Sequence, residues 1–304
     1  MKRLWTGVYP AATTQFAEDM SVDLDATRKG FEALIADGVD GLIVLGTCGE
    51  NNSLEAPEKL SVLEVAHGAG KGHVPVVSGV SEFTTARAVA FARKAEASGL
   101  AALMVLPAMV YVPTEDELFE HFRQVAEATS LPIMLYNNPP AYRVQITLSL
   151  LERLTSIPNI VAIKESSPDS RRFTDVINAF GDRYVLMAGL DDVSLEGLIL
   201  GAKGWVSGLT SAFPKESVAL MKALDAGDLA QARRIYRWFM PLLHLDAEHD
   251  LVQSIKLAEQ MMGRGSERVR MPRMTLRGAR RAQVMALVET AAKTRPSKVL
   301  SDAA

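Results

Sequence analysis

Short apolar segments alternate with longer amphipathic segments along the first two thirds of this chain. Eight of the short segments are continuously or nearly continuously apolar, and they cover residues 6–10, 41–45, 74–78, 102–106, 132–136, 160–164, 184–188 and 204–207. Such segments, without strict alternation, are typical of strands that are covered on both faces, as in a parallel sheet. Eight strand and helix units favour a closed barrel over an open sheet. The pattern therefore predicts an α/β fold, a TIM (β/α)8 barrel.

The amphipathic segments carry helix signals of their own. Residues 114–117 form a capping box, in which a threonine and a glutamate satisfy the first backbone N–H groups of a helix. Leu118, Phe122 and Val125 follow with the spacing of one helix face. We therefore expect these three side chains to be buried against the strands.

The last third of the chain predicts more helices than a barrel needs. Residues 214–226, 228–262 and 277–292 all have helical patterns, and only the first is required as the eighth barrel helix. We therefore expect two parts: a barrel over residues 1–226, and a C-terminal helical extension over residues 227–304 that packs on it.

Composition narrows the classes of function. Hydrophobic residues make up 48% of the 304 residues, which is enough for one large core, and the net charge of -3 gives no reason to expect nucleic acid or an anionic membrane as a partner. The single cysteine, Cys48, excludes an internal disulfide and fits a reducing compartment. The first ten residues lack the features of a signal peptide, and residues 100–113 are too few to span a bilayer. These features predict a cytoplasmic protein that acts on a small molecule.

Lys164 is the most informative single residue. It ends the apolar segment 159–163 and is followed directly by Glu165. An ammonium group at the end of a buried strand costs free energy, because desolvation favours the neutral amine, and a neutral amine is a nucleophile toward carbonyl groups. The alternative is a lysine whose side chain extends from the strand end into solvent.

Other polar groups are predicted at the same end of the barrel. Catalytic groups in such barrels lie at the carboxyl ends of the strands and in the loops that follow them. The residues at those points are Thr47, Cys48, Glu50, Tyr136, Asn137, Asn138, Lys164, Glu165, Gly189, Asp191, Asp192, Ser207 and Gly208. A phenol, a hydroxyl and an amine at one barrel mouth can form an imine and move protons to and from it. Two alternatives stay open: Asp191 or Asp192 as a helix N-cap, and Tyr136 as a core tyrosine whose hydroxyl bonds to backbone.

Three motifs carry a family resemblance. Residues 46–50, Gly-Thr-Cys-Gly-Glu, resemble a GTTGE signature; residues 136–139 resemble a YN-x-P signature; and residues 163–166 resemble a Schiff-base lysine motif. In this order and spacing they resemble the dihydrodipicolinate synthase and N-acetylneuraminate lyase superfamily, whose members are class I Schiff-base aldolases and lyases. The similarity extends from Trp5 to Gly208.

The resemblance implies a role for each site residue. Lys164 would form the imine with a 2-oxo acid, Tyr136 would shuttle protons, and the backbone N–H groups of Thr47 and Cys48 would hold the substrate carboxylate. The Thr47 hydroxyl can also relay protons. The expected substrate-binding residues are Thr47, Cys48, Asn138, Gly189 and Val206. We expect no cofactor and no metal, a small 2-oxo acid or imino acid as substrate, and a homo-oligomer, a dimer of dimers.

Three positions depart from the synthases of this superfamily. Cys48 replaces a second threonine, and residues 106–111 lack the tyrosine pair of the synthases, which leaves Tyr111 as the candidate third hydroxyl. Ala141 stands where synthases place an arginine for the carboxylate of the aldehyde substrate, and Arg143 comes two residues later. The sequence thus resembles the catabolic branches, which dehydrate or deaminate small hydroxylated acids.

We therefore expect an activity such as pyrroline-4-hydroxy-2-carboxylate deaminase. The alternatives are an authentic 4-hydroxy-tetrahydrodipicolinate synthase, a 2-keto-3-deoxy sugar acid aldolase or dehydratase, and a non-catalytic barrel that binds a 2-oxo acid. One further cluster has metal-ligand residue types, and it consists of His244, Asp246, Glu248 and His249. We interpret this cluster as a solvated polar turn, with a metal site as the alternative.

Overall fold

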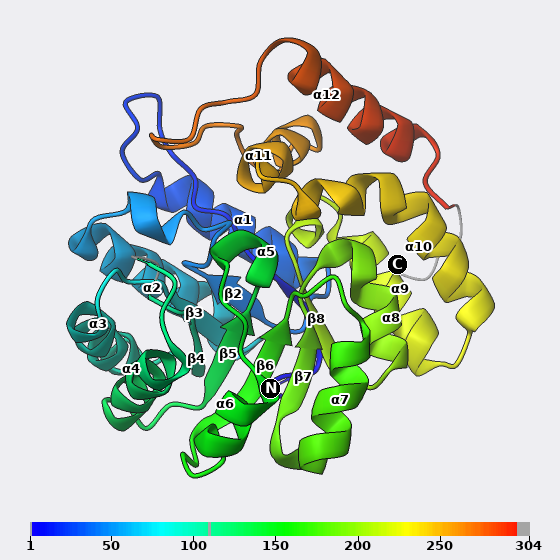
Figure 1. The fold of residues 1–304 in the computed structure, drawn as a ribbon. Coiled ribbons are helices and arrows are strands. Elements are labelled where there is room, and N and C mark those ends of the chain that lie inside the picture. Colours follow the sequence, from blue (N-terminus) through cyan, green and yellow to red (C-terminus); the bar gives the residue numbers. More distant parts are fainter. Residues whose placement is uncertain (1, 109–110, 297–304) are drawn as a thin grey trace.

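Eight parallel strands form the centre of the structure, a computed structural model that describes residues 2–108 and 111–296 (Figure 1). The strands are β1 (Gly7–Pro10), β2 (Leu42–Val44), β3 (Val76–Val80), β4 (Ala102–Val105), β5 (Ile133–Asn137), β6 (Ile160–Glu165), β7 (Val185–Ala188) and β8 (Gly204–Ser207). They pair in the order β1-β8-β7-β6-β5-β4-β3-β2, and a parallel bridge between Ala11 and Ile43 joins the two ends. The predicted TIM barrel is confirmed.

Strand β3 shows the largest shift from its predicted position. β3 begins at Val76, whereas the apolar pattern predicts a start at residue 74. Pro75 has no backbone N–H and cannot donate to a neighbouring strand. Its carbonyl oxygen still accepts a hydrogen bond of 3.0 Å from the Leu42 backbone N–H. The ladder therefore starts after the proline and runs to Val80.

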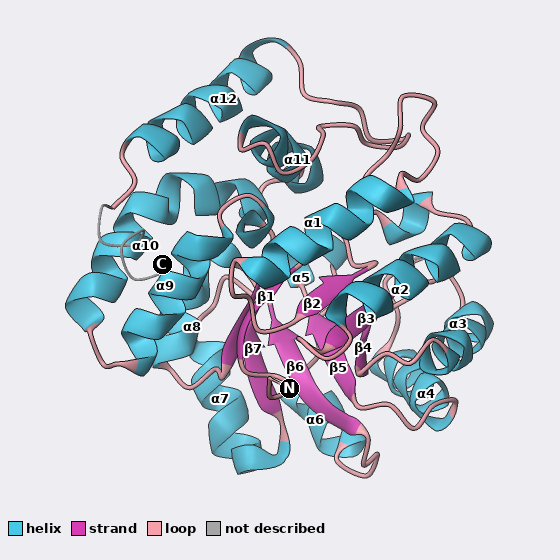
Figure 2. Ribbon diagram, turned by 180° about the vertical axis from the view of Figure 1, so that it is seen from behind, coloured by secondary structure: helices cyan, strands magenta, loops and turns pink. Residues whose placement is uncertain are grey.

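Helices connect the strands and cover the outside of the barrel (Figure 2). They are α1 (Leu24–Ala36), α2 (Ala56–Gly70), α3 (Thr85–Ala97), α4 (Glu115–Glu127), α5 (Pro139–Tyr142), α6 (Leu148–Leu154), α7 (Arg171–Phe180), α8 (Ser194–Ile199) and α9 (Pro214–Asp225). The predicted capping box starts α4, because the Thr114 hydroxyl accepts from the Glu117 backbone and the Glu117 carboxylate accepts from the Thr114 backbone. Leu118, Phe122 and Val125 are buried, as expected.

The C-terminal segment is a set of helices packed on the barrel, as predicted, but its first part was predicted incorrectly. The single helix expected over residues 228–262 is two helices, α10 (Leu229–Leu243) and α11 (Leu251–Met261), joined through the 3₁₀ segment η5 (His244–Ala247). Pro241 weakens the last turn of α10 because it lacks a backbone donor. Asp250, just before α11, forms a two-point ion pair with Arg280 of α12 (Gly278–Lys293), at 2.7 Å for both contacts. This tertiary contact thus stabilises the break between the two helices.

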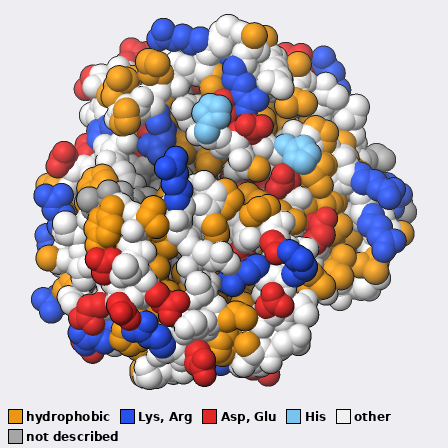
Figure 3. Space-filling model, in the orientation of Figure 1, with side chains coloured by type: hydrophobic (Ala, Val, Ile, Leu, Met, Phe, Trp, Pro, Cys, Tyr) orange, Lys and Arg blue, Asp and Glu red, His pale blue; other side chains and the backbone are white. Residues whose placement is uncertain are grey.

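The extension and the barrel share one hydrophobic core. Trp205 of β8 packs edge-on against Phe239 of α10, with 6.4 Å between the ring centroids, and Phe213 lies 5.8 Å from the same Phe239 ring. The boundary expected at residue 226 stays a prediction, and residues 297–304 lie outside the described residues. Among the helices described, none has the length and hydropathy needed to cross a bilayer. Basic and acidic side chains are interspersed over the face shown in Figure 3.

Candidate active site

Lys164 and Tyr136 lie side by side at the carboxyl ends of β6 and β5. The two residues are register partners in the sheet, and the Lys164 Nζ atom lies 4.1 Å from the centroid of the Tyr136 ring. Each side chain is 5% exposed. Lys164 therefore does not extend into solvent, and the amine faces a phenol inside the barrel mouth.

Gly189, directly after β7, makes the space for this lysine. A Cβ atom at Gly189 would lie 2.6 Å from Lys164 Cγ and 2.7 Å from Lys164 Cε, distances that real Cβ atoms do not show. The nearest atom to that position is the Ser166 hydroxyl oxygen, which is buried and has no hydrogen-bond partner among the described residues. Val206 is fully buried on β8; because Trp205 packs outward on α10, the alternation of side chains places Val206 toward the barrel interior.

Asn138 orients the Tyr136 phenol. Its Nδ2 atom donates to the Tyr136 hydroxyl oxygen at 2.9 Å, and its Oδ1 atom accepts from the Ala141 backbone N–H at 3.1 Å, which caps α5. The partner of the phenol is thus a side chain, and the alternative of a backbone partner is wrong. Burial raises the pKa of Tyr136, and the hydrogen bond from Asn138 opposes that effect. The phenol is therefore protonated at neutral pH.

Tyr142 is a site residue that sequence reasoning missed. Its hydroxyl shares a hydrogen bond with the Thr47 hydroxyl, and its ring lies edge-on to the Tyr136 ring, with 5.6 Å between centroids and 81° between planes. Burial raises the pKa of Tyr142. A signal for it exists in the sequence: a helix that starts after Asn138 returns residue 142, one turn later, toward the strand ends.

Tyr111, the expected candidate for the third hydroxyl, lies elsewhere. Its side chain is 61% exposed, and its hydroxyl donates to Glu117 at 2.6 Å. Met109 and Val110, in the same loop, lie outside the described residues. Within the described chain, Tyr142 and not Tyr111 joins Thr47 and Tyr136.

The loop after β2 presents two backbone donors. In the described part of the chain, the backbone N–H groups of Thr47 and Cys48 donate to no protein acceptor, so both are available to an anionic ligand. Burial raises the pKa of the Cys48 thiol, which is 4% exposed and therefore neutral.

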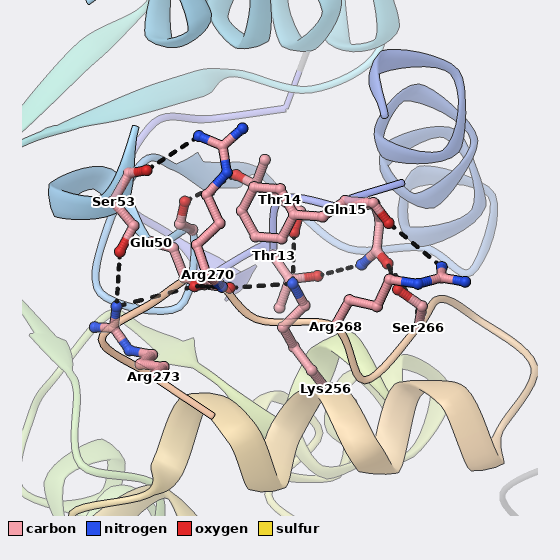
Figure 4. Close-up of polar contacts among 12 residues, drawn as sticks. Thr13, Thr14, Gln15, Glu50, Ser53, Lys256, Ser266, Arg268, Arg270 and Arg273 are labelled. Carbon is pink, nitrogen blue, oxygen red and sulfur yellow. Dashed lines mark hydrogen bonds and ion pairs between the residues drawn. The ribbon is translucent and has the colours of Figure 1, made fainter. Parts of the chain in front are cut away.

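Glu50, in the same loop, is not available to a ligand. Its buried carboxylate accepts from Lys256 Nζ at 3.1 Å and from the Arg270 backbone at 3.0 Å (Figure 4). Glu50 thus anchors this loop to the C-terminal helices.

Asp191 anchors the neighbouring loop, and the interpretation of it as a helix N-cap is wrong. Its carboxylate accepts from Trp205 Nε1 at 2.9 Å, from the Ser207 hydroxyl at 3.0 Å and from the Leu209 backbone at 3.0 Å. Helix α8 begins after Val193 without a side-chain cap. The buried groups at the end of β8 need an acceptor, and this need outweighs the capping preference of an aspartate.

Asp246 also departs from its prediction. His244, Glu248 and His249 are exposed, as expected of a solvated turn, but Asp246 is half-buried and points toward the strand ends. A Cβ atom at Gly208, just after β8, would lie 2.5 Å from Asp246 Oδ1. Burial raises the pKa of Asp246 to about 6, and the charge of Lys164 is the largest opposing effect. No group of three or more His, Cys, Asp or Glu side chains among the described residues has the geometry of a metal site.

Ala141 stands where the synthases have an arginine, and the next cation along this loop is Arg143. Ala141 is exposed, and Arg143 is exposed at the C-cap of α5, with a left-handed φ of 56°.

Glu165 follows Lys164 and is buried. Its carboxylate accepts from Asn137 Nδ2 at 2.7 Å and pairs with Arg172 at 3.2 Å. Glu165 and Asn137 therefore fix the ends of β6 and β5 relative to each other.

A barrel with a buried lysine beside a tyrosine at its mouth has the architecture of a class I, Schiff-base lyase or aldolase. The sequence profile described as the Dihydrodipicolinate synthetase family matches residues 4–291. The chain therefore belongs to the dihydrodipicolinate synthetase family and is an enzyme of this class.

Relatives with established names agree with this assignment. The chain is 34% identical to the 4-hydroxy-tetrahydrodipicolinate synthase of Sorangium cellulosum, over 92% of this chain and 93% of the relative. It is 33% identical to the enzyme of the same name from Methanothrix thermoacetophila, over 88% and 91% of the two chains. The solved structure of the 4-hydroxy-tetrahydrodipicolinate synthase from Methylacidiphilum fumariolicum SolV superposes with a TM-score of 0.91 at 27% identity, covering 97% and 98%. YagE, a prophage protein of the same family from E. coli, was solved in complex with pyruvate and gives a TM-score of 0.89 at 29% identity, covering 95% and 99%.

Proposed function

We propose that this enzyme deaminates and dehydrates a small hydroxylated imino acid through an imine on Lys164, with pyrroline-4-hydroxy-2-carboxylate as the expected substrate. The observation that carries this choice is the chemistry of the outer part of the site. Ala141 replaces the arginine of the synthases, Arg143 is exposed, and the carboxylate of Asp246, which lies beside Gly208 at the end of β8, acts on Lys164 through its charge. Such a site disfavours a second substrate with its own carboxylate and favours hydroxyl or amino groups.

The free backbone N–H groups at Thr47 and Cys48 would hold the carboxylate of the substrate. The Lys164 amine adds to C2 of the cyclic imine, the C2–N bond of the ring breaks, and the ring nitrogen leaves as a primary amine at C5. The new imine joins Lys164 to C2. It draws electrons from C3, so a proton leaves C3 toward the phenolate of Tyr136, which forms when the hydroxyls of Tyr136, Thr47 and Tyr142 together pass one proton to the departing ring nitrogen.

The enamine then expels the C4 hydroxyl, which leaves as water with a proton from the same hydroxyl groups. Proton shifts convert the product into an imine between C5 and its nitrogen, and water hydrolyses that imine to an aldehyde and ammonia. A further water releases the 2-oxo acid from Lys164. One water is lost and two are consumed, so the net reaction takes up one water and releases ammonia and 2,5-dioxopentanoate.

A second candidate is 4-hydroxy-tetrahydrodipicolinate synthase. The names of the relatives support it directly, because the chain covers nearly their whole length at 33–34% identity. Imine formation on Lys164 would be common to both functions. The two functions differ in the second step, because the synthase must bind an aldehyde that carries a carboxylate, and Ala141 gives that group no cationic partner.

The test is a substrate panel on the purified enzyme. We expect ammonia and 2,5-dioxopentanoate from pyrroline-4-hydroxy-2-carboxylate, and little turnover of pyruvate with aspartate semialdehyde or of a 2-keto-3-deoxy sugar acid. Borohydride should trap the substrate on Lys164, which mass spectrometry would locate. The variant Lys164→Met is the control and should form no adduct.

Other outcomes have clear meanings. Turnover of pyruvate with aspartate semialdehyde alone would establish the synthase and reject the deaminase. Saturable binding without any adduct would indicate a non-catalytic barrel. Undiminished turnover by Lys164→Met would reject the imine mechanism in all its forms.

We also propose that the enzyme is a homo-oligomer, a dimer of dimers. Tyr111 and Val112, on the loop after β4, are 61% and 60% exposed, and Phe83, on the loop after β3, is 46% exposed. Adjacent exposed apolar side chains, such as Tyr111 and Val112, support a contact surface between subunits. Sedimentation velocity on the purified protein would give the number of subunits.

A further inference from the structure

Asp246 reaches the active site from outside the barrel. It lies on η5, between α10 and α11, and α11 lies beyond the carboxyl ends of the strands in Figure 1. One hydrogen bond fixes this segment: His244 Nδ1 lies 2.8 Å from Asp192 Oδ2, in the loop after β7. Leu245, in the same segment, is 2% exposed and anchors the segment in the core. The half-buried Asp246 carboxylate is thus held in place over Gly208, at the end of β8.

The charge of this carboxylate acts on the site residues. The charge of Lys164 is the strongest influence opposing the effect of burial on the pKa of Asp246. In turn, the negative charge of Asp246 raises the pKa values of Cys48, Tyr136 and Asp191, after the larger effect of burial on each. Together with Lys164, these three residues stand at the ends of four different strands, β2, β5, β6 and β7. With its Oδ1 atom beside Gly208, the Asp246 carboxylate thus carries its negative charge into the barrel mouth.

A glycine at position 208 is part of this arrangement. A Cβ atom there would lie 2.5 Å from Asp246 Oδ1 and 2.5 Å from the Ile255 Cδ1 atom of α11. The absence of a side chain at Gly208 lets η5 approach the barrel mouth closely enough for a short aspartate to reach it.

We infer that Asp246 is a specificity-determining residue, whose carboxylate binds the amino or hydroxyl group at the end of the substrate away from C2 and repels a second carboxylate. The identity of that group rests on the proposed function. Opening of the cyclic imine would release a primary ammonium at C5, and a fixed carboxylate is a strong partner for it. The same charge excludes acids whose distal end is anionic, because like charges in a half-buried site repel strongly.

The test uses two 2-oxo acids as probes, so it does not depend on the physiological substrate. Pyruvate has no distal polar group, and 2-oxoglutarate has a distal carboxylate. Each is incubated with the full-length enzyme and borohydride, and the rate of adduct formation on Lys164 is measured by mass spectrometry. The variants are Asp246→Asn, which keeps the shape and removes the charge, and Glu248→Gln, an exposed position in the same turn, as the matched control.

We expect Asp246→Asn to trap pyruvate within about twofold of the wild-type rate and to raise the 2-oxoglutarate to pyruvate ratio by about tenfold or more. Glu248→Gln should leave both rates unchanged. An unchanged ratio in Asp246→Asn overturns the inference. Loss of pyruvate trapping as well would show that Asp246 acts on imine formation at Lys164 and not on the distal end of the substrate. That result would also overturn the inference. Asp246→Ser, assayed in the same way, should raise the ratio as Asp246→Asn does, which would show that the effect comes from loss of the charge and not from the asparagine side chain.

Failure of this inference can be told apart from failure of the proposed function. If the wild-type enzyme releases no ammonia from pyrroline-4-hydroxy-2-carboxylate, the deaminase proposal fails, but the ratio of the two probes still reports on Asp246. If ammonia is released, Asp246→Asn should lower kcat/KM for that substrate by about 100-fold, because a charged partner is lost.

Discussion

The ammonium group of Lys256 and the carboxylate of Glu50 are both fully buried, and their Nζ and Oε1 atoms lie 3.1 Å apart (Figure 4). Glu50 ends the loop that carries Thr47, and Lys256 comes from α11. Lys256 also donates to the Thr14 carbonyl oxygen at 2.8 Å and lies 4.4 Å from the centroid of the Phe16 ring. The C-terminal extension is therefore joined to the active-site loop by a buried charge pair.

Lys256→Met should strongly destabilise the protein. It leaves the Glu50 carboxylate buried without its ammonium partner, and breaking such a pair costs about 3–5 kcal/mol. Urea denaturation followed by circular dichroism would measure the loss. The double variant Glu50→Gln/Lys256→Met is the control and should recover part of the stability, because no unpaired charge remains. A cost below about 1 kcal/mol for the single variant would show that two other groups compensate Glu50 without Lys256. These are the Arg270 backbone N–H and the Arg273 guanidinium, which lies 3.9 Å from Glu50 Oε2.

Gly189→Ala should block imine formation while the fold persists. The new methyl group would press on Lys164 Cγ and Cε, at 2.6 and 2.7 Å, and would move the amine away from the Tyr136 ring. Overpacking of this kind costs about 1–3 kcal/mol in stability. Borohydride trapping of pyruvate should fall by about 100-fold, because a misplaced reacting group loses its orientation. Gly68→Ala is the control, since nothing lies within 4 Å of the added atom, and it should leave trapping unchanged.

The barrel and the pair Lys164 and Tyr136 could be predicted from the sequence because both depend on local patterns of apolar residues. Apolar segments locate the strands to within two residues, and Lys164 and Tyr136 each end such a segment, so a closed barrel must bring them to one rim. Tyr142 and Asp246 were not found, because their positions depend on how short connections turn in space. A four-residue helix returns Tyr142 to Thr47, and a break between two helices aims Asp246 at the strand ends. A pattern of polar residues cannot distinguish such a turn from a solvated one.

Tyr142→Phe should slow turnover without preventing imine formation. It removes the hydroxyl that bonds to Thr47 and leaves the ring packed on Tyr136. Loss of one group of a proton relay lowers kcat by about 100-fold or more. Steady-state kinetics and pyruvate trapping, measured on the same preparation, separate the two effects. Tyr111→Phe serves as the comparison and should leave kcat within about twofold, since its hydroxyl bonds to Glu117. The reverse result would assign the third hydroxyl to Tyr111.

Glu259 should make folding stability depend on pH. Burial raises the pKa of this α11 carboxyl to about 7, against the hydrogen bonds of 2.9 and 2.8 Å from the Thr13 hydroxyl. A folded pKa above the unfolded value means that the folded state holds its proton more tightly. The contribution is therefore fully present below the ordinary glutamate pKa, near 4.5, and is lost as pH rises through about 7.

The free energy of unfolding should accordingly fall between pH 5 and pH 8, with a slope of at most about 1.4 kcal/mol per pH unit from this one group. Glu259→Gln should flatten that slope, because the amide stays neutral at every pH in the range. Urea denaturation at several pH values would measure both curves. Glu289→Gln, at an exposed position of α12, is the control and should reproduce the wild-type slope. Equal slopes in the wild type and Glu259→Gln would mean that Glu259 is ionised in the folded protein and that Lys256 compensates its charge.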